Sequence, residues 1–139
     1  MKIENKNILI TGATGGIGEA IVRTFDANNN NILLTGTRNE KLKRLSESLN
    51  EKAEYVECDF SNLNNIENII NKINNSFDNK IDILINNAGI AGPSYKSWDY
   101  PINDWNNVFD IDVNGVFYCC KVVVPHMIKN NYGRIVNIS

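Results

Sequence analysis

The chain has few of the residues on which disulfide scaffolds and metal sites depend. Its 139 residues include three cysteines and one histidine. Three cysteines, an odd number without framework spacing, fit a reducing compartment such as the cytoplasm better than a disulfide scaffold. The histidine, His126, has no cysteine or carboxylate at ligand spacing, so we expect no metal site.

Long apolar runs and an excess of charge of one sign are also missing. Asn, Asp or Lys interrupts every apolar run, so we expect no membrane-spanning helix. The formal net charge of −2 predicts neither nucleic acid nor an anionic membrane as a partner. The N-terminal stretch MKIENKNILITG has no apolar segment of secretory length. A hydrophobic content of 42% is enough for one core, so a single domain over residues 1–139 is expected.

Apolar segments typical of strands and helices alternate along the chain. The expected strands are 7–11, 32–35, 53–58, 81–85 and 134–138, which are short and rich in β-branched residues. Apolar residues recur at helical spacing between them. Because parallel strands need crossover connections, this alternation predicts an α/β fold: a doubly wound, Rossmann-type parallel sheet.

The expected helices differ in length and in their starting residues. The apolar stripe of the first runs from Ile17 to Phe25, while Asn39 and Ser61 are the expected N-caps of the second and third. A long helix over about 104–129 follows, with a kink expected at Pro125. Its apolar side would contain Trp105, Val108, Phe109, Val113, Val116, Cys120, Val123, Val124 and Met127.

A glycine-rich segment, TGATGGIG at 11–18, connects the first expected strand to the first helix. Glycine is needed where backbone turns tightly or approaches a phosphate without a Cβ in the way. The N–H groups that open the next helix then face the phosphate, helped by the helix dipole. In this strand–turn–helix context the segment predicts a dinucleotide site, with a structural turn as the alternative.

Two motifs together resemble a known family. Gly12, Gly16 and Gly18 depart from the G-x-G-x-x-G spacing, and NNAG at 86–89 directly follows the fourth expected strand. This pair resembles the short-chain dehydrogenase/reductase family, as do Asn114 in DVNGVF and the closing GRIVNIS. The N-terminal half is most similar to the 3-oxoacyl-[acyl-carrier-protein] reductases. The stretch from WDY to PHM is also similar to sugar and polyol dehydrogenases.

The resemblance implies a set of cofactor-binding residues. They are Gly12, Ala13, Thr14, Gly15, Gly16, Ile17, Gly18, Thr37, Arg38, Asp59, Phe60, Asn86, Ala88, Gly89 and Val113. By this resemblance the glycine segment cradles the adenosine ribose and pyrophosphate, and Asp59 and Phe60 meet the adenine. Asn86 would lie beside the adenosine ribose, and Val113 would line the adenine side.

The end of the second expected strand bears on the choice of dinucleotide. Family members that prefer NAD usually place an acid there, whereas this chain has Gly36, Thr37 and Arg38. A guanidinium and a hydroxyl suit a 2′-phosphate, which favours NADP. Two alternatives stay open: Arg38 as a solvated residue at the helix start, and NAD binding helped by Glu40.

The resemblance also identifies one catalytic candidate and several missing groups. The family's matching Asn sits at a helix irregularity and holds a water of a proton relay, which implies this role for Asn114. The alternative is one more Asn in an Asn-rich chain. Ser139 matches the position before the family's catalytic Ser, and no Tyr-x-x-x-Lys occurs in the sequence. We therefore expect an N-terminal portion of a reductase, inactive alone.

The implied activity is reduction of a ketone to an alcohol by NADP-linked hydride transfer, most like that of the 3-oxoacyl-[acyl-carrier-protein] reductases of fatty acid biosynthesis. A sugar or polyol dehydrogenase is the alternative within the family, and a non-catalytic dinucleotide-binding protein is the alternative of another class. The implied partners are a small or acyl-carrier-bound carbonyl substrate and further copies of the chain, as a dimer or tetramer.

Overall fold

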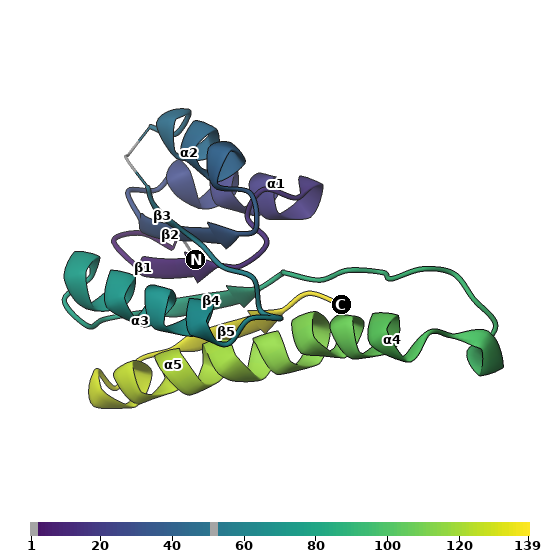
Figure 1. Ribbon diagram of the computed structural model, residues 1–139. Helices are drawn as coiled ribbons and strands as arrows, with labels where there is room; N and C mark the ends of the chain where they lie inside the picture. Colours follow the sequence, from purple (N-terminus) through teal and green to yellow (C-terminus); the bar gives the residue numbers. More distant parts are fainter. Residues whose placement is uncertain (1–2, 51–52) are drawn as a thin grey trace.

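The computed structural model describes residues 3–50 and 53–139 (Figure 1). Its strands are β1 (Asn7–Ile10), β2 (Asn31–Gly36), β3 (Glu54–Glu57), β4 (Ile83–Asn86) and β5 (Arg134–Asn137). They form a five-stranded sheet in the order β3-β2-β1-β4-β5. Every neighbouring pair is parallel, which confirms the predicted doubly wound α/β fold.

Helices cover both faces of the sheet. They are α1 (Gly16–Asp26), α2 (Asn39–Glu47), α3 (Asn64–Ser76), α4 (Ile102–Phe109) and α5 (Gly115–Lys129), with a 3-10 turn η1 (Ser97–Asp99) and a π-helical segment η2 (Asp110–Asn114). Figure 1 shows α1 and α2 on one side of the strands and α3 and α5 on the other. The predicted long helix is therefore α4, η2 and α5 in sequence, and α5 continues through Pro125 to its end.

The sheet separates two apolar cores. Leu9, Leu33 and Leu84 pack with residues of α3 and α5 on one face. Residues next to them in the strands, such as Ile8 and Leu34, pack with α1 and α2 on the other face. Successive side chains of a strand point to opposite faces. A parallel sheet covered on both sides therefore needs the near-continuous apolar strands found in the sequence.

Both expected helix caps are wrong. Asn39 is the first residue of α2, and Arg38 takes the N-cap position without a side-chain hydrogen bond. Leu63 precedes α3. The Ser61 hydroxyl instead donates to Asp59 Oδ1 (2.7 Å), and the Ser61 N–H donates to the same oxygen (2.9 Å). These bonds form a local turn after β3, so Ser61 belongs to the turn and not to the helix.

The apolar side expected for the long helix is buried only in part. Val123 and Met127 of α5 lie in the core, whereas Trp105, Phe109 and Val113 are 53%, 43% and 51% exposed. The reason is visible in Figure 1, where α4 extends past the end of the sheet and has no strands beneath it. The stripe expected for α1 is not its buried face: Ile17 is exposed and Phe25 only partly buried, whereas Val22, outside that stripe, is fully buried.

Every helix within residues 3–50 and 53–139 is too short or too polar to span a membrane.

Candidate dinucleotide-binding site

An open pocket of about 420 Å³ lies beyond the carboxyl ends of β1 to β4. Its lining consists of Gly12, Thr14, Gly15, Gly16, Ile17, Gly18, Gly36, Thr37, Arg38, Cys58, Asp59, Phe60, Asn87, Ala88, Gly89, Ile90 and Ile111. Ligands of open α/β sheets bind at this edge, where the strand order reverses. All the residues expected to contact the cofactor line the pocket, except Ala13, Asn86 and Val113.

The glycine segment has two positions that tolerate no side chain and one that faces open space. Gly12 has a φ of +61°, and a Cβ on it would lie 2.8 Å from Ala88 Cα. A Cβ on Gly18 would meet the Gly12 carbonyl oxygen and lie 2.8 Å from Asn87 Nδ2. A Cβ on Gly16 would meet nothing within 4 Å. The turn is therefore packed on the sheet side and open on the pocket side.

Helix α1 begins at this turn. Its first bond is donated by the Glu19 N–H to the Gly15 carbonyl (2.8 Å). The N–H groups before Glu19 open the helix and have no intrahelical acceptor. Because these groups border the pocket and carry the positive end of the helix dipole, they suit an anionic diphosphate.

A hydrogen-bond network joins the glycine segment to NNAG. The Thr11 hydroxyl oxygen accepts from the N–H groups of Asn87 and Ala88, both at 3.0 Å. The Asn87 amide nitrogen donates to the carbonyls of Thr11 and Gly12, both at 3.1 Å. Asn87 lines the pocket. Thr11 does not line it but holds Asn87 and Ala88 in place through these hydrogen bonds. Neither Thr11 nor Asn87 was among the residues expected to contact the cofactor; their positions directly after β1 and β4 are the sequence signal that identifies them.

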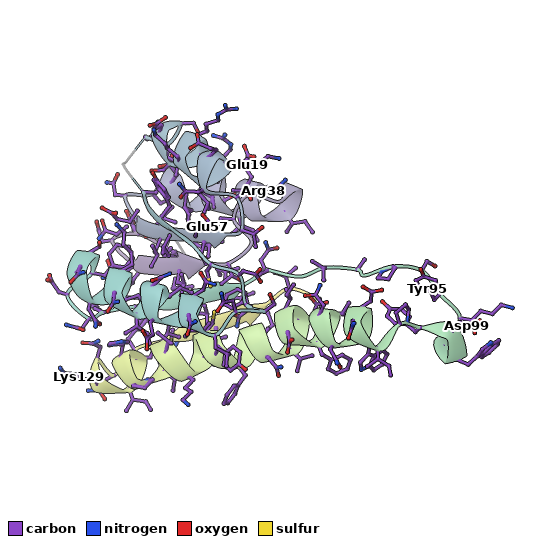
Figure 2. All side chains as sticks on the ribbon, in the orientation of Figure 1. Glu19, Arg38, Glu57, Tyr95, Asp99 and Lys129 are labelled. Carbon is purple, nitrogen blue, oxygen red and sulfur yellow. The ribbon has the colours of Figure 1, made fainter. Side chains whose placement is uncertain are left out.

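The connection from β2 to α2 places the positively charged side chain of Arg38 at the pocket. Thr37 and Arg38 line it, and the Arg38 carbonyl accepts the first bonds of α2. Arg38, labelled in Figure 2, lies on the side of the sheet that carries α1 and α2, as does Glu19 of α1. Glu19 is paired with Arg23 of its own helix at 2.7 Å, so its carboxylate is engaged there. The guanidinium and hydroxyl at this end of the pocket offer donors to a phosphate.

The opposite wall is formed after β3. Phe60 is buried, and α5 approaches it closely, since a Cβ on Gly115 would lie 2.9 Å from Phe60 Cγ. Burial, with a smaller contribution from the nearby Asp59 carboxylate, raises the pKa of the Cys58 thiol to about 12, although a hydrogen bond with Thr35 opposes the shift. Cys58 is therefore a neutral part of the wall and not a nucleophile near neutral pH.

Three residues expected at the cofactor lie elsewhere. Asn86 is buried, and its amide nitrogen donates to Asn137 Oδ1 (2.9 Å) on β5. Ala13 is fully buried, with its N–H on the Thr35 carbonyl (3.0 Å). Val113 is half-exposed, and Ile111 contributes to the wall from the same segment. Strand alternation directs Asn86 to the face of the sheet that α5 covers, where its amide nitrogen also approaches Cys120 Sγ (3.8 Å), and the wide π turn directs Val113 outward.

The catalytic candidate Asn114 ends the π-helical segment. The expected helix irregularity is present, since the Gly115 N–H bonds to the Asp110 carbonyl across the π turn. The Asn114 amide nitrogen donates to Asp110 Oδ1 (2.9 Å) on the same segment. Asn114 does not line the pocket, and its catalytic role stays a prediction. Asp112, two residues earlier, instead reaches the residue after NNAG: its Oδ1 accepts the Ile90 N–H at 2.9 Å.

No group of three His, Cys, Asp or Glu side chains in the described residues is arranged to hold a metal ion.

Comparison with known proteins identifies the family. The model of the family described as short chain dehydrogenase matches residues 6–139. The chain therefore belongs to the short-chain dehydrogenase family, whose relatives are oxidoreductases.

Individual relatives differ in the substrate that they are named for. The chain is 36% identical over 135 residues to the NADP-dependent 3-hydroxy acid dehydrogenase YdfG of Escherichia coli O6:H1, covering 95% of this chain and 53% of that protein. The closed form of serine dehydrogenase complexed with NADP+ matches with a TM-score of 0.87 at 34% identity, covering 96% and 53% of the two chains. NAD+-bound xylitol dehydrogenase matches with a TM-score of 0.87 at 36% identity, covering 99% and 54%. The chain spans about half the length of the curated relatives it matches.

Proposed function

We propose that this chain forms the NADP-binding part of an oxidoreductase that interconverts a ketone and an alcohol. The observation that carries the proposal is the pocket itself. Gly12 and Gly18 leave room on the sheet side only for backbone, and Gly16 faces open space. A cradle of this kind, at a helix N-terminus, fits the diphosphate of a dinucleotide.

Arg38 and Thr37 support NADP as the dinucleotide. Both line the pocket at the end of β2, where the 2′ position of the adenosine ribose lies in Rossmann-type sites. An arginine there favours a 2′-phosphate, because its planar guanidinium forms paired hydrogen bonds with phosphate oxygens. The named relative YdfG is NADP-dependent, which agrees with this assignment.

Each part of the pocket has a proposed task. The glycine turn and the start of α1 hold the diphosphate, Asp59 and Phe60 hold the adenine, and Ala88 and Gly89 let the cofactor approach NNAG. Asn114 contributes to a proton relay. When bound, the nicotinamide supplies or receives the hydride. The chain's own residues bind and orient the cofactor. In reduction, the alkoxide formed from the ketone would take up a proton through the relay to which Asn114 contributes, and in oxidation the alcohol would release its proton the same way.

The substrate that we favour is a 3-oxo acid or its acyl-carrier thioester, as in a 3-oxoacyl-[acyl-carrier-protein] reductase of fatty acid biosynthesis. Oxidation of a 3-hydroxy acid gives a 3-oxo acid, so the name of YdfG fits the same chemistry. A second candidate is a sugar or polyol alcohol, because the xylitol dehydrogenase is equally similar at 36% identity.

Two experiments test the proposal at different levels. Calorimetric titration of this chain with NADPH and with NADH should give saturable binding, at least about tenfold tighter for NADPH, a difference of about 1.4 kcal/mol. No binding of either would contradict the site, and equal binding would contradict the preference for NADP. The complete protein encoded by the native gene is then assayed with a 3-oxoacyl thioester and with xylitol. Turnover of xylitol alone would favour the polyol alternative.

We also propose that the protein assembles with copies of itself. Ile102, Phe117 and Ile128 in α4 and α5 are all more than half exposed, and exposed apolar surface favours association. Sedimentation of the complete protein should give a dimer or tetramer, and the Phe117→Lys variant should shift it toward monomer. A monomeric wild-type protein would contradict this self-association.

The three free cysteines favour a reducing compartment such as the cytoplasm.

A further inference from the structure

The π-helical segment Asp110–Asn114 changes the direction of the side chains between α4 and α5. A π turn closes its hydrogen bonds over five residues instead of four, here from the Gly115 N–H to the Asp110 carbonyl. Such turns are rare and often mark functional positions. Two polar side chains of this segment, Asp112 and Asn114, consequently have different partners.

Asp112 is the side chain of the π segment that bonds to a residue lining the pocket, Ile90. Its Oδ1 accepts the Ile90 N–H at 2.9 Å over a sequence separation of 22 residues. The neighbouring Gly89 makes this approach possible, since a Cβ there would lie 3.3 Å from the same oxygen. A carboxylate that accepts from a backbone N–H forms a charge-assisted bond, stronger than a neutral one. Asn114, by contrast, bonds within its own segment to Asp110.

The segment that Asp112 holds needs an external anchor. Ile90 follows the last residue of NNAG and lies in a stretch without regular secondary structure from 87 to 96. Thr11 fixes the N-terminal end of NNAG through Asn87 and Ala88. Asp112 fixes the other end, and both ends border the pocket, because Ala88, Gly89 and Ile90 line it.

We propose that Asp112 is a positioning residue that fixes Gly89 and Ile90 against the π segment and so sets the shape of the dinucleotide pocket. This inference rests on the proposed function for its effect on binding. The link itself, from Asp112 to the Ile90 N–H, can be tested without a cofactor. The carboxylate acts through its acceptor oxygen, so an amide oxygen of the same reach should replace it.

Three variants separate the parts of this proposal. Asp112→Ala removes the acceptor, Asp112→Asn keeps an acceptor and removes the charge, and Asp99→Ala removes an equal charge from the exposed turn η1. Calorimetric titration with NADPH should show about tenfold weaker binding for Asp112→Ala, as expected for loss of one hydrogen bond of moderate strength. Asp112→Asn and Asp99→Ala should bind within about threefold of wild type. Unchanged affinity of Asp112→Ala, or loss in Asp112→Asn equal to that in Asp112→Ala, would overturn the proposal.

A second measurement keeps the proposal testable if Asp112→Ala does not fold. In the wild-type chain without cofactor, NMR should detect scalar coupling across the hydrogen bond, between the Ile90 amide nitrogen and the Asp112 carboxyl carbon. Its absence, together with fast exchange of the Ile90 amide, would overturn the positioning role. If the coupling is present but NADPH does not bind to wild type, the link stands and the proposed function fails.

Discussion

Gly12 and Ala88 lie so close that a Cβ on Gly12 would be 2.8 Å from Ala88 Cα and 2.9 Å from its nitrogen. The two residues come from the segments after β1 and β4, which pair as neighbours at the centre of the sheet. Backbone thus meets backbone at the base of the pocket. Any side chain at Gly12 would separate the two segments that shape it.

The Gly12→Ala variant should therefore be destabilised. Its φ of +61° is unfavourable for alanine, and the added methyl group would contact Ala88 backbone. Strain and overpacking of this kind cost about 1–3 kcal/mol each. Urea unfolding measures the loss. Gly16→Ala is the matched control, because nothing lies within 4 Å of the added Cβ, and its free energy of unfolding should not fall. Equal stability of the two variants would contradict the packing described.

Arg38→Ala should weaken NADPH binding much more than NADH binding. Hydrogen bonds to charged groups contribute about 1.5–3 kcal/mol, which corresponds to about ten- to a hundredfold in affinity. Only NADPH offers the 2′-phosphate. Competition between the two dinucleotides, followed by fluorescence, measures the ratio. Lys43→Ala, which removes an exposed cation from the helix α2 that follows Arg38, should leave the ratio unchanged. Parallel losses for NADPH and NADH would assign Arg38 a role other than phosphate recognition.

Gly115→Ala should destabilise the protein although alanine is the better helix former. Alanine gains about 1 kcal/mol over glycine inside a helix. Here its methyl group would lie 2.9 Å from Phe60 Cγ and 3.1 Å from Phe60 Cβ. Overpacking against a buried ring costs about 1–3 kcal/mol, so we expect a net loss in thermal unfolding. A rise in melting temperature would show that α5 and Phe60 are less tightly packed.

The three cysteine thiols should differ in their reactivity toward an alkylating reagent. Burial raises the pKa of Cys58 to about 12, and burial also raises that of Cys119. The thiolate is the reactive form. Iodoacetamide at neutral pH should therefore label the partly exposed Cys120 in the native protein, and reach the other two only after denaturation. Mass spectrometry identifies the sites, and native labelling of Cys58 at the rate of Cys120 would contradict their burial.

The same pKa predicts how stability depends on pH. The unfolded chain loses the Cys58 proton near the ordinary value of 9.0, whereas the folded chain keeps it to about 12. The contribution of the neutral thiol is therefore complete below about pH 9 and is lost as the pH rises toward 12. Urea unfolding across this range should show a shallower decline for Cys58→Ala than for wild type.

The sheet and the glycine turn are predictable from sequence because both depend on local chemistry. Strands buried on two faces need continuous apolar runs, and the conformation of Gly12 is accessible mainly to glycine. The strand boundaries moved by a few residues: the fourth strand was expected at 81–85, and β4 is Ile83–Asn86.

The buried side of the long helix and the role of Asp112 depend on tertiary structure instead. Helical periodicity assumes one hydrogen-bond pattern, and the π segment changes it between α4 and α5. Trp105 belongs to an apolar stripe, yet α4 lies beyond the sheet and leaves it exposed. Asn86 and Val113 do not line the pocket for related reasons, since the face that a side chain presents follows from strand parity and helix geometry; their cofactor contacts stay predictions.

The most direct test of the account is an amide NMR titration of this chain with NADPH. We predict saturable shifts confined to the segments around 12–18, 36–38, 58–60 and 87–90, which line the pocket. The same titration with NADH should leave the Thr37 and Arg38 amides less perturbed. Shifts that do not saturate, or that map to the far ends of the strands, would contradict a dinucleotide site at the carboxyl edge of the sheet.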